Sequence, residues 1–276
     1  MKERISNLRL GEIELTLSKK ERSILRSLLQ FHFLNTDQLR RLFFSEGHTT
    51  LQASKTNTLK ILHRLRRHGL INHLDQQYKL GCYGPKVYIW FLTEAGYRLL
   101  NLGTEQDGKR KRFSEASSTF LNHTIAVAEC YIQFTEICQA EPTLSIRCLD
   151  IEPDCWRAFQ KDGKAVSLRP DLYAETLCGE YRDRWFIEMD LDTEALPVVI
   201  EKCHRYQQYY MTNKEQTATG KFPVVLWIVP NSRRKESIID QIKGTFGNRY
   251  VHMFLVITPD ELHGVLLNGV KKEDLC

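Results

Sequence analysis

Three carboxylates lie in a pattern that could hold a metal ion. Arg169-Pro170-Asp171 opens one expected strand, and Glu188 and Asp190 lie two positions apart in the next one. Because side chains alternate along a strand, Glu188 and Asp190 share a face, and Asp171 joins them if the two strands pair as a hairpin. Carboxylates that close repel one another, and Mg²⁺ or Mn²⁺ would relieve the repulsion. The predicted metal site, formed by Asp171, Glu188 and Asp190, could activate water for phosphodiester cleavage.

The helix expected after these strands adds a cation and two phenols. Lys202, Tyr206 and Tyr209 follow at i, i+4 and i+7, so they share one helix face. Lys202 is therefore a fourth catalytic candidate, and Glu129 on an earlier helix is a weaker additional carboxylate. In the alternative interpretation the tyrosines only pack on the sheet, and the acids pair with nearby cations. Those cations would be Arg169, Arg182 and Arg184.

A second pattern is cationic and suits the negative charge of nucleic acid. Lys60, Arg64 and Arg67 line one side of a helix expected over 54–68, nearly opposite its apolar side. Phosphates attract such cations, and base edges accept and donate hydrogen bonds. The candidate DNA-binding residues on this helix and the following hairpin are Lys55, Thr56, Lys60, His63, Arg64, Arg67, Lys79 and Lys86. The alternative is a basic helix face that is only solvated.

Local signals place this basic helix inside a recognisable arrangement. Ser18 and Glu21 form a capping box, Asn35 can cap a second helix, and Gly69 ends the third. Strands are expected over 70–74 and 87–92, and a further helix over 93–100. Three helices, a two-stranded hairpin and a closing helix predict a winged helix-turn-helix that binds DNA.

The rest of the chain predicts a second domain. A long helix is expected over 114–139, and strands over 144–149, 172–177, 185–191, 224–229 and 252–257, with helices over 194–212 and 233–245. This order favours an α/β domain with a mixed sheet flanked by helices, within an α+β chain. The predicted boundaries are 1–102 for the DNA-binding domain, 103–113 for a polar, glycine-containing linker and 114–276 for the α/β domain.

The two halves of the chain also differ in net charge. Residues 1–112 carry 21 lysines and arginines against 10 acids, a net charge of +11, whereas the remainder has a net charge of −6. The basic half indicates double-stranded DNA as a partner, and a homodimer is plausible because a single winged helix binds short sites weakly. The sequence has no export signal or membrane span, so we expect a cytoplasmic protein with no membrane partner. Its eight cysteines form no CxxC pair and are expected to be reduced thiols.

Several of these segments together resemble a known family. They are Arg169-Pro170-Asp171, the run 186–194, Lys202 with Tyr206, and the runs 92–96 and 121–126. In these residues the chain resembles the replication-relaxation family of bacterial mobile elements. The resemblance implies a role in plasmid or integrative-element replication or DNA relaxation, with replication or mobilisation proteins as partners. It also implies a C-terminal region similar to the PD-(D/E)xK nuclease fold.

The nuclease pattern leads to two hypotheses about activity. In that pattern Asp171 matches the first acid and Glu188 the second, but Asp190 stands where lysine belongs, and Lys202 could replace it from the helix. The favoured hypothesis is a site-directed DNA-binding protein of a mobile element, acting in replication, relaxation or their regulation, with a degenerate nuclease-like domain. The alternative is a metal-dependent DNA endonuclease that the winged helix targets.

Overall fold

The computed structural model describes residues 4–45, 47, 50–74, 78–79, 86–104, 117–270 and 276. The chain forms two compact units, Met1–Ile132 and Gln133–Cys276, and is a mixed α+β protein as predicted. The division falls inside a long helix, whereas the predicted linker at 103–113 lies mostly outside the described residues. Among the described residues no helix is long and apolar enough to cross a bilayer.

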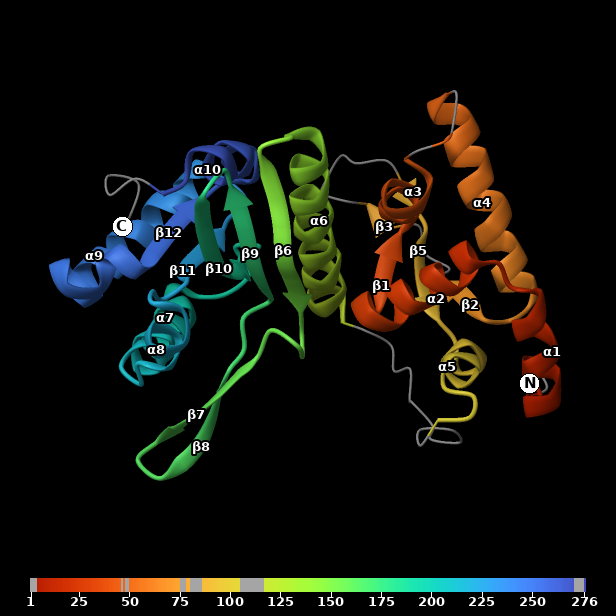
Figure 1. Ribbon diagram of the computed structural model, residues 1–276, viewed down its shortest axis with the longest axis horizontal. Coiled ribbons are helices and arrows are strands. Elements are labelled where there is room, and N and C mark those ends of the chain that lie inside the picture. Colours follow the sequence, from red (N-terminus) through yellow and green to blue (C-terminus); the bar gives the residue numbers. More distant parts are fainter. Residues whose placement is uncertain are drawn as a thin grey trace. The chain divides into compact units, whose positions relative to one another are not determined.

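The first unit combines helices with a small antiparallel sheet (Figure 1). Its elements are α1 (Asn7–Thr16), α2 (Lys19–Phe31), β1 (Phe33–Asn35), α3 (Thr36–Phe44), α4 (Leu51–Arg67), β2 (Ile71–His73), β3 (Tyr78–Lys79), β4 (Lys86–Val87), β5 (Ile89–Leu92) and α5 (Glu94–Leu100). The sheet order is β1-β5-β2, and β3 pairs with β4 as a separate antiparallel ladder. Helix α1 and strand β1 were not expected from the sequence.

Capping residues fix where the helices of the first unit begin. Ser18 accepts a hydrogen bond from the Glu21 amide at 3.2 Å, and the Glu21 carboxylate accepts one from the Ser18 amide at 2.9 Å. Asn35 and Gln38 repeat this reciprocal arrangement at the start of α3. The caps satisfy amides that have no partner within the helix. The apolar side of α2 is then buried through Ile24, Leu25, Leu28 and Phe31.

Gly96 lets α5 pack directly onto backbone. A Cβ at this position would lie 2.2 Å from the carbonyl oxygen of Leu70 and 2.6 Å from Cδ1 of Leu92. Thr93 caps the same helix by accepting from the Gly96 amide at 3.2 Å. The run 92–96 is therefore constrained by a close approach that only glycine permits.

The second unit contains the mixed five-stranded sheet that the sequence predicts. Its elements, with α6 (Ser118–Ala140) leading into it, are β6 (Leu144–Ile151), β7 (Arg157–Lys161), β8 (Lys164–Leu168), β9 (Leu172–Cys178), β10 (Tyr181–Met189), α7 (Leu196–Tyr210), α8 (Lys214–Thr219), β11 (Val224–Ile228), α9 (Ser232–Tyr250), β12 (Phe254–Ile257) and α10 (Leu262–Asn268). The sheet order is β12-β11-β10-β9-β6. Strands β10, β11 and β12 are parallel, and β9 is antiparallel to β10 and β6.

Two details of this sheet differ from the predicted elements. Strand β10 begins at Tyr181, because it pairs with β9 as a hairpin, and it ends at Met189, so Asp190 follows the strand rather than lying in it. The hairpin of β7 and β8, which extends away from the sheet in Figure 1, was not predicted. One apolar core joins α7 and α9 to this sheet, and it includes Tyr206, Tyr209, Phe186 and Trp227.

Candidate functional site

Helix α4 in the first unit presents one polar side to solvent. Its buried side consists of Ser54, Thr58, Leu62 and Leu65. On the opposite side, the exposed residues at i, i+4, i+7 and i+11 are Thr56, Lys60, His63 and Arg67, and Lys55 is exposed as well. Arg64, Arg66 and Arg67 also lie in the last turn, where cations interact favourably with the helix dipole. The structure thus places five of the predicted DNA-binding residues in solvent on one helix.

A cationic groove of about 350 Å³ runs beside this helix. It is lined by Lys20, Phe44, Asn57, Lys60, Ile61, Arg64 and Arg67, which come from α2, α3 and α4. Lys20 lies 4.6 Å from the centre of the Phe44 ring. The sequence did not single out Lys20, because its approach to α4 depends on tertiary packing. Four positively charged side chains, Lys20, Lys60, Arg64 and Arg67, therefore line one concave surface.

Arg64 differs from the other cations of the groove because it also binds within the unit. Its guanidinium donates to the carbonyl oxygen of Thr16 at 3.1 Å and lies 3.4 Å from Oε1 of Glu21. Glu21 is 1% exposed and its other oxygen is occupied by Ser18. Arg64 therefore neutralises a buried carboxylate, and only part of its charge is directed to the groove.

The predicted hairpin contacts are described only through their backbone. Lys79 and Lys86 are partners in the antiparallel ladder of β3 and β4. Their side chains, and the loop at 80–85 between the strands, lie outside the described residues. Their contact with DNA stays a prediction.

In the second unit, Asp171, which immediately precedes β9, lies across from Glu188 of β10. Leu172 pairs with Ile187 in the antiparallel register, and the Asp171 amide donates to the Ile187 carbonyl at 3.0 Å. Continuing this antiparallel register by one residue places Asp171 across from Glu188, so the two side chains lie on the same face of the sheet. The Asp171 carboxylate accepts from the Met189 amide at 2.7 Å, which ties it to the end of β10.

Glu188 is buried against two residues of α7. The Tyr206 hydroxyl donates to Oε1 at 2.6 Å, and the Lys202 ammonium donates to Oε2 at 3.4 Å. Burial, followed by the charge of Asp171, raises the pKa of Glu188 to about 8, and Lys202 and Tyr206 oppose this rise. Burial alone would lower the pKa of Lys202, but Glu188, Asp171 and Glu194 hold it above its ordinary value. The prediction that Lys202 lies beside the carboxylates agrees with this geometry.

Asp190 binds an arginine, whereas the sequence suggested that it would bind a metal ion. It is 4% exposed, and its Oδ2 accepts hydrogen bonds from Nε and Nη2 of Arg234 in α9, at 3.1 and 2.7 Å. Its Oδ1 accepts from the backbone amide of Asp192. Arg234 also lies 3.2 Å from the carboxylate of Asp192 and donates to the Glu194 carbonyl at 2.7 Å. Asp190 is thus bound by an arginine that the sequence did not indicate.

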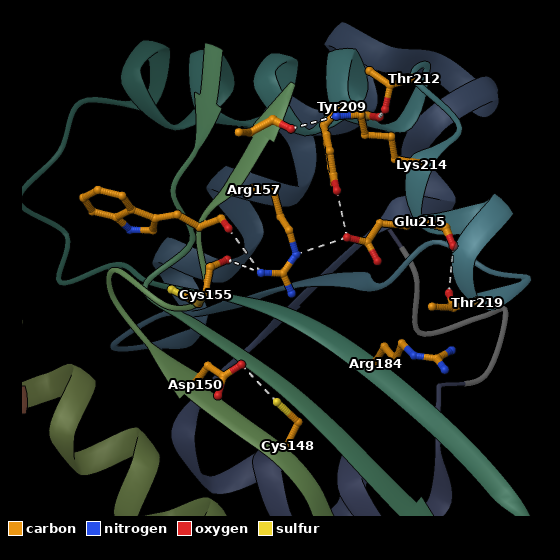
Figure 2. Close-up of polar contacts among 12 residues, drawn as sticks. Cys148, Asp150, Cys155, Arg157, Arg184, Tyr209, Thr212, Lys214, Glu215 and Thr219 are labelled. Carbon is orange, nitrogen blue, oxygen red and sulfur yellow. Dashed lines mark hydrogen bonds and ion pairs between the residues drawn. The ribbon is translucent and has the colours of Figure 1, made fainter. Parts of the chain in front are cut away.

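Tyr209, which shares a helix face with Lys202 and Tyr206, belongs to a different group of interacting residues. The Tyr209 hydroxyl donates to Oε1 of Glu215 at 2.8 Å, and Arg157 donates to the same oxygen at 3.2 Å (Figure 2). The Arg157 guanidinium also lies over the Tyr173 ring, 4.5 Å from its centre. Tyr209 therefore joins the hairpin of β7 and β8 to α7 and α8, and does not contact Glu188 in this arrangement.

The arginines considered from the sequence as partners of the acids contact other groups as well. Arg182 and Arg184 both pair with Glu175, at 3.3 and 2.9 Å. Arg169 stacks on the Trp156 ring, 4.5 Å from its centre. Glu129, the weaker candidate carboxylate, belongs to the first unit, where it pairs with Arg41 and accepts from Gln38 at 3.2 Å.

The donor set of these carboxylates suits a metal ion poorly in this arrangement. Both oxygens of Glu188 and both of Asp190 accept hydrogen bonds from protein donors. The Lys202 ammonium already supplies the positive charge that a cation would bring to Glu188. Within the ranges that the structure describes, no three His, Cys, Asp or Glu side chains are grouped as metal ligands. The described cysteines are free thiols, and burial raises the pKa of Cys155 to about 12.

A comparison with protein families adds an independent result. A family model described as replication-relaxation matches residues 25–225, which is more than half of the chain and includes both α4 and the Asp171–Glu188 pair. No curated protein and no solved structure matches the chain.

Proposed function

The chain belongs to the replication-relaxation family, and from this premise we propose that it binds double-stranded DNA of a mobile element during replication or relaxation. The observation that carries the proposal is the cationic groove beside the exposed side of α4. Lys20, Lys60 and Arg67 border it, so a phosphate backbone can follow the groove while the exposed side of α4 meets base edges.

The arrangement of the first unit supports a winged helix-turn-helix. Helices α3 and α4 follow each other closely, as the two helices of such a motif do, and α4 carries the exposed polar side. The ladder of β3 and β4 has the place in the chain that a wing would occupy. We assign Lys55, Thr56, Lys60, His63 and Arg67 to base or backbone contacts, and Lys79 and Lys86 to the wing.

For the second unit we propose a PD-(D/E)xK-like domain that has lost catalysis. The hairpin of β9 and β10, with Asp171 opposite Glu188, supports the resemblance. The hydrogen bonds that fill Glu188 and Asp190 support the loss, since a metal ion would have to displace Lys202, Tyr206 or Arg234. The domain then serves to contact replication or mobilisation proteins.

Binding of the full-length chain to a fluorescent DNA duplex tests the proposal. We expect Lys60→Ala/Arg67→Ala to bind at least about tenfold more weakly than the wild type, because two phosphate contacts are lost. The matched control, Arg26→Ala/Lys243→Ala, removes two exposed cations that do not line the groove and should bind normally. Equal affinity of all three proteins would contradict the proposed placement of DNA.

A metal-dependent endonuclease is the second candidate, and one contact favours it. Lys202 lies 3.4 Å from Glu188 across from Asp171, which is where a lysine supplied by the helix would have to be. Supercoiled DNA incubated with the protein in Mg²⁺ or Mn²⁺ distinguishes the candidates. Nicking by the wild type that Glu188→Gln lacks would establish the nuclease, and absence of nicking by both supports the non-catalytic proposal.

A further inference from the structure

The outer side of α1 carries two leucines that are almost fully exposed. Leu8 is 79% exposed and Leu15 is 87% exposed. Seven residues separate them, which is two helical turns, so they point the same way. They lie opposite Leu10 and Ile13, the buried residues of α1. Single exposed leucines are common on protein surfaces, but two aligned on one short helix form an apolar strip.

A glycine lies between the two leucines on the same outer side. Glycine weakens a helix interior, so its presence there usually reflects a close approach of other atoms. A Cβ at Gly11 would meet nothing within 4 Å, so packing inside the chain does not require glycine. The position instead leaves the backbone between Leu8 and Leu15 open to another helix.

Charges beside the strip alternate in sign. Arg9 and Glu12 are exposed and lie on one flank of it, with Nη1 of Arg9 2.7 Å from Oε2 of Glu12. When two such helices meet in antiparallel fashion about a two-fold axis, the same flanks face each other. Each Arg9 then lies near the partner's Glu12 as well as its own, which makes the surface complementary to itself.

We propose that α1 is a dimerisation surface that binds α1 of a second copy of this chain in antiparallel orientation. Leu8 packs against Leu15 of the partner subunit, the reciprocal contact follows from the symmetry, and Gly11 lies at the axis. The proposal goes beyond DNA binding by a single chain. Its consequence is that two α4 helices can engage one duplex at two half-sites.

Sedimentation equilibrium of the full-length chain, over about 1 to 100 µM protein, tests the dimer. We expect wild type to dimerise and Leu8→Glu/Leu15→Glu to be monomeric. Gly11→Gln is the second variant: glutamine is a better helix former than glycine, and a Cβ at this position meets nothing within 4 Å, so the variant should fold at least as well. It should nonetheless raise the dimer dissociation constant at least about tenfold, because its side chain separates the helices.

The control variant is Met211→Glu, which replaces an exposed apolar residue (66% exposed) of the second unit and should dimerise like the wild type. Circular dichroism confirms that each variant is folded. A monomeric wild type overturns the proposal. So does unchanged dimerisation of both α1 variants, or equal loss of the dimer in Met211→Glu.

Discussion

Arg234 donates two hydrogen bonds to a single oxygen of Asp190, from Nε at 3.1 Å and from Nη2 at 2.7 Å. The side chains are 8% and 1% exposed, so the pair is almost sealed from water. The contact joins the residue after β10 to the first turn of α9. Arg234 thus binds Asp190, the residue that stands where the proposed nuclease pattern would have a lysine.

Removing Arg234 alone should destabilise the second unit strongly. Arg234→Met leaves the Asp190 charge buried without its partner, which costs about 3–5 kcal/mol. Urea unfolding followed by the tryptophans of this unit measures the loss. Combining Arg234→Met with Asp190→Leu removes the unpaired charge as well and should recover much of the stability. A single variant as stable as the wild type would show that the pair has no structural role.

Stability of the second unit should fall as pH rises, through Glu188. Because its pKa in the folded chain is raised from 4.5 to about 8, the folded unit holds this proton more tightly than the unfolded chain. The contribution is complete below about pH 4.5 and is lost as pH rises through about 8. Unfolding free energies of wild type and Glu188→Gln should therefore diverge over this window in favour of the variant. Parallel pH profiles would rule out Glu188 as the titrating group.

Gly96 should not tolerate even one added methyl group. In Gly96→Ala the Cβ meets the Leu70 carbonyl oxygen, so we expect a loss of about 3 kcal/mol in the first unit. Gly244→Ala in α9 is the control, since its Cβ meets nothing within 4 Å, and it should be neutral or stabilising by up to about 1 kcal/mol. Hydrogen exchange resolved by segment reports each unit separately. Equal protection in both variants would contradict the close approach.

Replacing Arg64 should lower the stability of the first unit, whereas replacing Lys60 should not. Arg64→Ala leaves Oε1 of the buried Glu21 without its cation, which should cost about 1–2 kcal/mol, because Arg64 itself is partly exposed. Lys60→Ala removes an exposed charge and should unfold like the wild type. Thermal unfolding of the two variants makes the comparison. Identical melting curves would show that Arg64 acts only in the groove.

The sequence predicted those features of the fold that depend on residues close together in the chain. Ser18 and Asn35 mark helix starts because a cap bonds to amides three residues away. The spacing of Lys202 and Tyr206 predicted a shared face, and both reach Glu188. Arg234 could not be predicted as the partner of Asp190, since it lies 44 residues further along the chain and carries no motif. Lys20 joins the groove for the same kind of reason, through packing of α2 near α4.

The salt dependence of DNA binding tests the central claim most directly. Each phosphate contact made by a cation adds about 0.9 to the slope of log affinity against log salt concentration. For the full-length chain on one duplex, Lys60→Ala/Arg67→Ala should therefore lower the slope by about 1.8 relative to wild type. The Arg26→Ala/Lys243→Ala control should keep the wild-type slope. A double variant in the groove with the same affinity and slope as wild type would contradict DNA binding through α4.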